Sequence, residues 1–250
     1  MEMTSRTFFS PISPYREKRP VSSKLIFIVC EGVTEDDYFR KVVSQKFDSI
    51  KTRIQIINIF SEILKKPPKK RTKEETNLLN SSNPKNLLEK MKDFISKKEH
   101  IYEFSKHDDE FWLIMDINNH TDSVHIKDWN QVLNECDSNG YHYAVSNPFF
   151  ELWLLLHHDD VSNEDYKFAV TKIHSYERTS HFRERLNGLK VPLKNQKHIK
   201  NPENYTKGNI QKAVERAKIL DKNHERYPTD LGSTAYKLME LMLDYDNNSK

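Results

Sequence analysis

Short apolar runs separated by helical patterns constrain the fold of this chain most strongly. Residues 24–30 (KLIFIVC) and 110–115 (EFWLIM) are apolar at almost every position, and residues 53–60 (RIQIINIF) alternate. Residues 141–146 (YHYAVS) form a fourth predicted strand. Near-continuous apolar runs are typical of strands that are buried on both faces, as in a parallel sheet covered by helices. The pattern therefore predicts an α/β fold with a mostly parallel four-stranded sheet flanked by helices.

Apolar residues at helical spacing follow these strands along the chain. Thr34 is placed to cap the first helix, and Asn83 with Pro84 predicts the cap and first turn of another. The predicted helices cover residues 34–47, 84–102, 126–136 and a segment that starts at Pro148. Residues 162–246 are predicted to be helical, with one loop at residues 191–206 that contains proline and lysine.

The same pattern divides the chain into three parts. Residues 1–22 hold three prolines and no hydrophobic period, which predicts an extended N-terminal arm. Residues 23–160 form the predicted α/β core. Residues 161–250 form a predicted helical extension that packs on this core.

Composition excludes several classes of protein. The chain has only five glycines and neither of the glycine-rich phosphate-binding motifs, which argues against dinucleotide-binding folds and P-loop NTPases. Two cysteines cannot build a disulfide framework. No apolar run approaches the roughly 20 residues that span a bilayer, and the N-terminus lacks the apolar part of a signal peptide. We therefore expect a soluble cytoplasmic protein with no membrane partner.

Acidic residues are placed where the predicted strands end. Glu31 follows the first strand, Asp116 follows the third, and Ser146 ends the fourth. Glu35 and Glu151 lie in the first turns of the helices after the first and fourth strands. Ligands of open parallel sheets gather at the carboxyl ends of the strands. Oxygen-only ligand sets suit Mg²⁺ or Mn²⁺, and a pair of such ions can stabilise both oxygens of a phosphodiester cleavage.

Each of these acidic residues also has an ordinary structural explanation. Glu31 fits a turn, and Asp116 fits a turn or a helix cap. Glu35 and Glu151 complement the dipoles of the helices that they begin. The argument for a metal site therefore depends on these residues coming together in space.

Three segments of the chain carry a resemblance to a known family. They are residues 29–39 (VCEGVTEDDYF), 112–116 (WLIMD) and 146–157 (SNPFFELWLLLH). Together they resemble the RloB-like (AbiLii) family of abortive-infection proteins, over roughly residues 23–243. The first and third segments are specific as a pair, although each is weak alone.

The resemblance implies a Toprim-like fold, because the RloB-like family is similar to the Toprim domains of topoisomerases, primases and certain nucleases. In the nuclease branch, carboxylates after the first and third strands and a later Ser and Glu form the metal site, and a downstream Lys assists. The matching positions of this chain are Glu31, Glu35, Asp116, Ser146, Glu151 and, less closely, Lys207.

The chain departs from the family pattern at one metal ligand. The expected Asp-x-Asp is Asp116-Ile117-Asn118, followed by Asn119 and His120. The Asn118 carbonyl can still bind a metal, but the lost charge predicts weaker Mg²⁺ binding, a single ion, or a shift to Mn²⁺ with help from His120. A degenerate site kept for binding alone is the other explanation.

Two basic stretches are candidates for phosphate contacts. Because 40 Lys and Arg residues nearly balance 37 Asp and Glu residues, any basic surface must be local. Residues 65–73 (KKPPKKRTK) and 191–200 (VPLKNQKHIK) are such stretches. A few basic residues can hold a nucleic acid through its phosphates, but a solvated loop explains the first stretch equally well. The candidate nucleic-acid-binding residues are Lys69, Lys70, Arg71, Lys194, Lys197 and Lys207.

Together these observations predict a metal-dependent nuclease of the Toprim type. It would cleave DNA or RNA with Mg²⁺ or Mn²⁺, with Glu31, Glu35, Asp116 and Lys207 as catalytic residues. Glu31, Glu35, Asp116, Asn118 and Glu151 would hold the metal. The resemblance also implies an antiphage effector with an ABC-type ATPase partner. The alternative is a catalytically degenerate subunit that binds nucleic acid or regulates its partner.

Overall fold

The protein is described from a computed structural model. The residues described are 25–30, 32–47, 49, 54–58, 66–73, 84–102, 104, 109–117, 123–170, 175–195, 197–222 and 224–248. The predicted arm, residues 1–22, lies outside them, as do Glu31 and Asn118.

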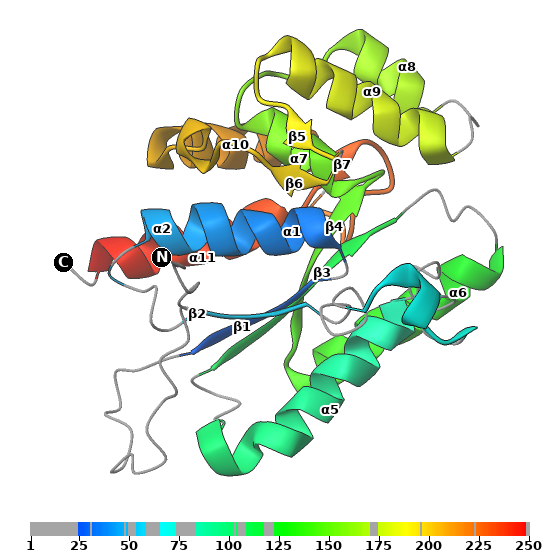
Figure 1. Ribbon diagram of the computed structural model, residues 1–250, viewed down its shortest axis with the longest axis vertical. Coiled ribbons are helices and arrows are strands. Elements are labelled where there is room, and N and C mark those ends of the chain that lie inside the picture. Colours follow the sequence, from blue (N-terminus) through cyan, green and yellow to red (C-terminus); the bar gives the residue numbers. More distant parts are fainter. Residues whose placement is uncertain are drawn as a thin grey trace.

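The described strands form a main sheet with the order β2-β1-β3-β4-β7 (Figure 1). The strands are β1 (Ile26–Cys30), β2 (Ile54–Asn58), β3 (Glu110–Asp116), β4 (His142–Asn147) and β7 (Gly232–Ser233). The first four pair in parallel, which confirms the predicted four-stranded sheet. The two-residue β7 adds an antiparallel edge to β4, which the sequence pattern did not predict.

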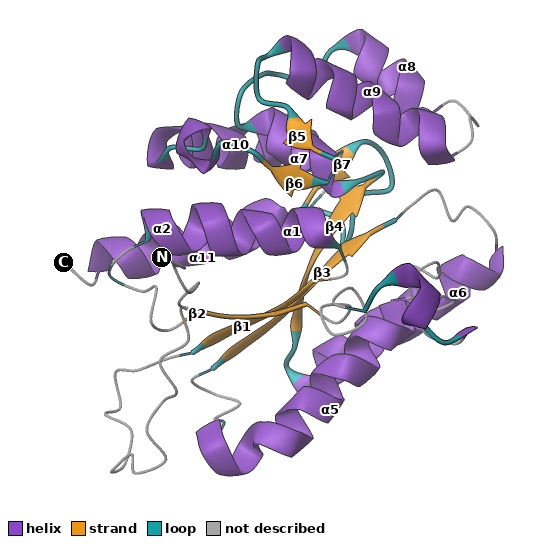
Figure 2. Ribbon diagram, in the orientation of Figure 1, coloured by secondary structure: helices purple, strands orange, loops and turns teal. Residues whose placement is uncertain are grey.

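Helices cover both faces of this sheet (Figure 2). On one face lie α1 (Val33–Asp37), η1 (Tyr38–Val43), α2 (Ser44–Lys46), α7 (Phe150–Leu156), α10 (Lys207–Leu220) and α11 (Ala235–Asn248). On the other face lie α5 (Pro84–Tyr102) and α6 (Ser123–Asn139). Farther out are α8 (Asn163–Val170) and α9 (Ser175–Gly188), of which α9 packs on α7. No helix in the described ranges is long and apolar enough to cross a bilayer.

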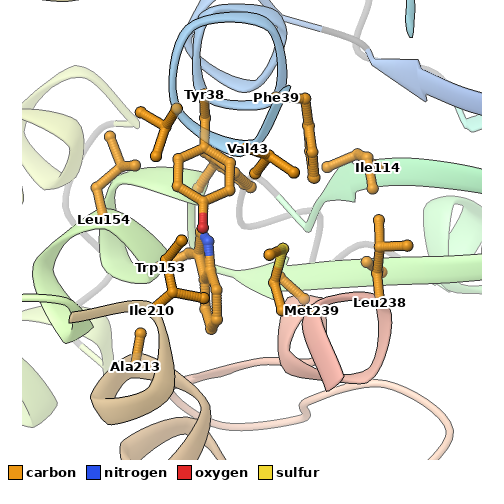
Figure 3. Packing of buried hydrophobic residues seen from close by; sticks show 14 of the residues in the cluster. Tyr38, Phe39, Val43, Ile114, Trp153, Leu154, Ile210, Ala213, Leu238 and Met239 are labelled. Atoms are coloured by element: carbon orange, nitrogen blue, oxygen red, sulfur yellow. The ribbon is translucent and has the colours of Figure 1, made fainter. Parts of the chain in front are cut away.

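The side chains of β1 explain its continuous apolar pattern. Ile26, Ile28 and Cys30 face the cluster built with the α1–α2 helix, α7, α10 and α11. Phe27 and Val29 point to the opposite cluster, with α5 and α6. The strand is therefore buried on both faces, as the sequence predicted. Figure 3 shows side chains from η1, α7, α10 and α11 meeting in the first cluster.

The C-terminal part contains more than helices and a loop. The predicted loop includes a hairpin of β5 (Leu193–Lys194) and β6 (His198–Ile199), followed by the short helix η4 (Pro202–Asn204). The basic stretch before α5 contains another short helix, η3 (Pro68–Lys70).

Two predicted helix starts are shifted. The helix after β4 begins at Phe150 rather than at Pro148, because Phe149 has an extended backbone (φ −144°, ψ 159°). The helix after β1 begins at Val33, with Gly32 in the capping position, so Thr34 is not its cap.

Candidate functional site

The carboxyl ends of neighbouring strands lie at the same edge of the sheet. β1 and β3 are adjacent and parallel, with Cys30 opposite Ile114. Asp116 ends β3 and lies opposite Ser146 of β4. Backbone pairing continues one residue further, where the Ile117 N–H donates to the Ser146 carbonyl at 2.9 Å. The register therefore places the end of β3 between the ends of β1 and β4.

Glu35 is held at this edge by the first turn of α1. Its side chain is buried, and the residue is only 5% exposed. The carboxylate lies so close to Gly32 that a Cβ atom at this position would overlap it. Gly32 has an ordinary backbone conformation (φ −108°, ψ 170°), so backbone freedom does not explain a glycine here. A Cβ atom at this position would displace the end of the Glu35 side chain, and glycine thus leaves room for the carboxylate.

Asp116 is the second described carboxylate at this edge. It is half-buried at the end of β3, next to β1. Asp116 therefore ends β3, and Glu35 lies in the first turn of the helix that follows the adjacent strand β1. Glu31 and Asn118, the other expected ligands from these two segments, lie outside the described residues.

Glu151 is engaged by an arginine that the sequence analysis did not identify. Its Oε1 accepts hydrogen bonds from Arg183 Nε at 3.0 Å and Nη2 at 2.7 Å. Glu151 lies in the first turn of α7, and Arg183 comes from α9. Ser146, the other residue matched from this segment, shares a hydrogen bond with the Ser233 hydroxyl at 2.9 Å. In this arrangement Glu151 pairs with a guanidinium through Oε1, so a metal ion at Glu151 would share the carboxylate with Arg183.

Lys207 does not lie with these carboxylates. Its Nζ donates to Asp246 Oδ2 at 2.5 Å and lies 5.4 Å from the centre of the Phe47 ring. Phe47 follows the continuous helix of α1, η1 and α2, twelve residues after Glu35, or roughly 18 Å along the helix axis. The structure therefore does not bring Lys207 together with Glu35: Lys207 pairs with Asp246 of α11, at the distal end of the helix that carries Glu35, and its expected role beside the metal stays a prediction.

The described lysines of the two basic stretches are exposed. Lys69 and Lys70 are exposed on η3, and Arg71 donates from Nε to the Lys66 carbonyl at 3.0 Å. Figure 1 shows this segment in cyan on the right, the side toward which β1 and β3 run. Lys194 and Lys197 are exposed on the β5–β6 hairpin, which contacts α1.

Other residues of the resembling segments are structural. The hydroxyl of Tyr38 lies 2.9 Å from His157 Nε2, and His157 Nδ1 lies 2.8 Å from the Trp153 carbonyl. Because a carbonyl only accepts, Nδ1 donates and Nε2 accepts from Tyr38. Burial lowers the pKa of His157 to about 3, so the ring is neutral. A buried neutral ring carries no charge that could interact with the dipole of α7, so these two hydrogen bonds account for His157.

This contact joins the first and third resembling segments. Tyr38 lies on η1, while Trp153 and His157 lie on and directly after α7. Tyr38 and Trp153 pack edge to face, with ring centres 6.3 Å apart, at the middle of the cluster (Figure 3). Trp153 and Phe149 are both buried, so these aromatic residues belong to the core.

The donor chemistry of this edge fits a hard divalent cation in part. Glu35 and Asp116 offer carboxylate oxygens, the ligands that Mg²⁺ and Mn²⁺ prefer. Cys30, which ends β1, is a poor ligand because burial and the nearby Asp36 and Glu35 raise its thiol pKa. Within the described ranges, no group of three His, Cys, Asp or Glu side chains could hold a metal ion. A complete site would need Glu31 and Asn118.

Comparison with known proteins gives one match. Searches with the chain match no curated protein and no solved structure. The model described as RloB-like protein matches residues 26–242, a span that includes all described strands and most of α11. The chain therefore belongs to the RloB-like protein family.

Proposed function

We propose that this protein is a Toprim-like nuclease that cleaves DNA or RNA with Mg²⁺ or Mn²⁺. The observation that carries this proposal is the placement of two carboxylates after adjacent parallel strands: Asp116 ends β3, and Glu35 lies in the first turn of the helix that follows β1. Separate segments of the chain supply these carboxylates, as expected for a site at the edge of an α/β sheet. Family membership supports the same assignment.

Glu35, Asp116, Glu31 and Asn118 would hold the metal. A bound ion of this kind supplies charge neutralisation at the phosphate and a more acidic water. The residues of the chain supply orientation: Gly32 leaves room for the Glu35 carboxylate, and β3 fixes Asp116 beside β1. Glu31, the first acidic residue after β1, would move the proton of the attacking water. Lys207 is not part of this proposal, because it pairs with Asp246.

The proposal includes a biological setting that follows from the family. We infer an antiphage abortive-infection effector that works with an ABC-type ATPase. The exposed basic segments support contact with nucleic acid, and the ATPase would control when cleavage occurs.

A cleavage assay tests this function. Purified protein is incubated with supercoiled plasmid and with tRNA in Mg²⁺ or Mn²⁺, alone and with a candidate ABC-type ATPase partner. We expect Glu35→Gln and Asp116→Asn each to lower the cleavage rate about 100-fold or more, since each removes a charged metal ligand. Glu215→Gln, on the exposed side of α10, is the matched control and should leave the rate unchanged. Equal rates for wild type and Asp116→Asn would refute the proposal.

A catalytically degenerate binding or regulatory subunit is the second candidate. The Arg183–Glu151 ion pair favours it, because a guanidinium already offsets the charge of a carboxylate that was expected to hold metal. This candidate predicts that the wild type binds no Mn²⁺ and that Asn118→Asp gains binding. Calorimetry with Mn²⁺ on both proteins distinguishes the two functions.

A further inference from the structure

The segment between α9 and η4 carries positive charge without any acidic residue. From residue 190 to residue 202 the sequence contains four lysines and one histidine, and Glu203 is the first acid to follow. The structure shows all four lysines exposed: Lys190, Lys194, Lys197 and Lys200. We name residues 190–200 the basic hairpin.

The backbone of the basic hairpin is well anchored. Val191 and Ile199 are buried, and the Val191 N–H donates to the Leu186 carbonyl at 2.9 Å. Lys190 and Asn195 both have positive φ, 62° and 52°, at the bends that begin the hairpin and form its tip. The lysine side chains therefore project from a folded frame rather than from a loose loop.

A buried carboxylate attaches the basic hairpin to the helix that carries Glu35. Asp37 Oδ2 accepts from the Ile199 N–H at 3.1 Å and lies 3.0 Å from His198 Nδ1. The same oxygen accepts from Lys41 Nζ at 2.6 Å. Asp37 follows Glu35 by two residues in α1. The position of the hairpin is thus coupled to the helical turn that places Glu35 at the sheet edge.

We infer that the basic hairpin binds the phosphate backbone of a nucleic acid and that Asp37 fixes it beside the sheet edge. The inference rests on the proposed function only in its statement that the bound strand leads toward Glu35 and Asp116. Lysine ammonium groups bind phosphates as point charges and read no sequence, so the hairpin would set affinity and register. An anionic membrane is the less favoured ligand, because the apolar Val191 and Ile199 are buried and cannot insert among lipids.

Binding in the absence of metal tests the hairpin without cleavage. Fluorescence anisotropy of the full chain with labelled single-stranded RNA, single-stranded DNA and duplex DNA is measured in EDTA between 50 and 200 mM salt. We expect Lys194→Gln/Lys197→Gln to reduce the slope of log K against log salt by about 2, roughly 1 for each lost phosphate contact. Lys90→Gln/Lys212→Gln, an exposed pair on α5 and α10, is the matched control and should keep the wild-type slope. Equal slopes for the hairpin variant and wild type would overturn the inference.

Asp37→Asn tests the anchoring separately from bulk charge. The substitution makes the protein more positive, so charge alone predicts tighter binding. Loss of the anchor predicts weaker binding despite the added charge, and tighter binding would contradict the role of Asp37. Thermal unfolding shows whether Asp37→Asn is folded. If it is not, the Lys194→Gln/Lys197→Gln variant alone tests whether the basic hairpin binds nucleic acid.

Two further arms separate this inference from the proposed function. Asp116→Asn should bind nucleic acid at least as tightly as wild type in EDTA, because it keeps every hairpin lysine and removes a negative charge. Loss of binding in the hairpin variant together with an inactive wild type would support the hairpin and refute the nuclease. Cleavage by wild type together with unchanged binding in the hairpin variant would support the nuclease and refute the role of the hairpin. Sedimentation with anionic phospholipid vesicles that depends on the hairpin, without nucleic-acid binding, would overturn the inference in favour of a membrane.

Discussion

The buried His157 predicts a specific loss of stability in mild acid. In the folded protein burial lowers its pKa to about 3, whereas an unfolded histidine has a pKa of about 6.5. Between about pH 6.5 and pH 3, His157 is therefore protonated in the unfolded state and neutral in the folded state. Folding stability must fall as the pH is lowered through this interval, by at most about 1.4 kcal/mol per pH unit. At pH 5 the expected loss from this residue alone is about 2 kcal/mol relative to pH 7.5.

Urea unfolding at several pH values measures this effect. Other groups titrate over the same range, so the informative quantity is the difference in unfolding free energy between wild type and His157→Gln. We expect this difference to shrink by about 2 kcal/mol between pH 7.5 and pH 5, because the variant has no histidine to protonate at this position. His224→Gln, at an exposed histidine, is the control and should follow the wild-type curve. A constant difference between wild type and His157→Gln across this range would refute the neutral buried state.

Three substitutions follow from contacts around the site. Gly32→Ala should abolish Mn²⁺ binding, because the Cβ of the new alanine displaces the Glu35 carboxylate. The unfolding free energy should change by only about 1 kcal/mol. Mn²⁺ binding that is retained in calorimetry would contradict this prediction. Arg183→Met should cost about 3 kcal/mol in urea unfolding, since Glu151 is buried, and adding Glu151→Gln should recover part of the loss. Lys207→Met should destabilise the fold by about 1–3 kcal/mol and leave the cleavage rate per folded molecule unchanged. A variant that is as stable as wild type but no longer cleaves would instead support a catalytic role for Lys207.

The main sheet was predictable because its strands are buried on both faces. β1 and β3 send alternate side chains into two clusters, and this leaves a continuous apolar run in the sequence. β7, β5 and β6 have only two residues each, too few to show a period. These short strands form because the backbone of another strand pairs with each of them, and such a pairing leaves no pattern in the local sequence.

The candidate site was only partly predictable for a related reason. Glu35 and Asp116 could be placed because parallel strands end at a common edge. The partners of Glu151 and Lys207 could not, since Arg183 lies 32 residues and Asp246 lies 39 residues further along the chain. The resembling segments themselves combine two roles, because Glu35 faces the sheet edge while Tyr38 and His157 join η1 to the end of α7.

Calorimetric titration of Mn²⁺ into the metal-free protein tests the central claim most directly. The account predicts that wild type binds Mn²⁺ and that Asp116→Asn and Glu35→Gln each weaken binding at least about tenfold, as loss of a charged ligand requires. Asp244→Asn, at an exposed position of α11, should bind as wild type does. Absence of binding to wild type, or equal binding by all four proteins, would contradict a metal site formed by Glu35 and Asp116.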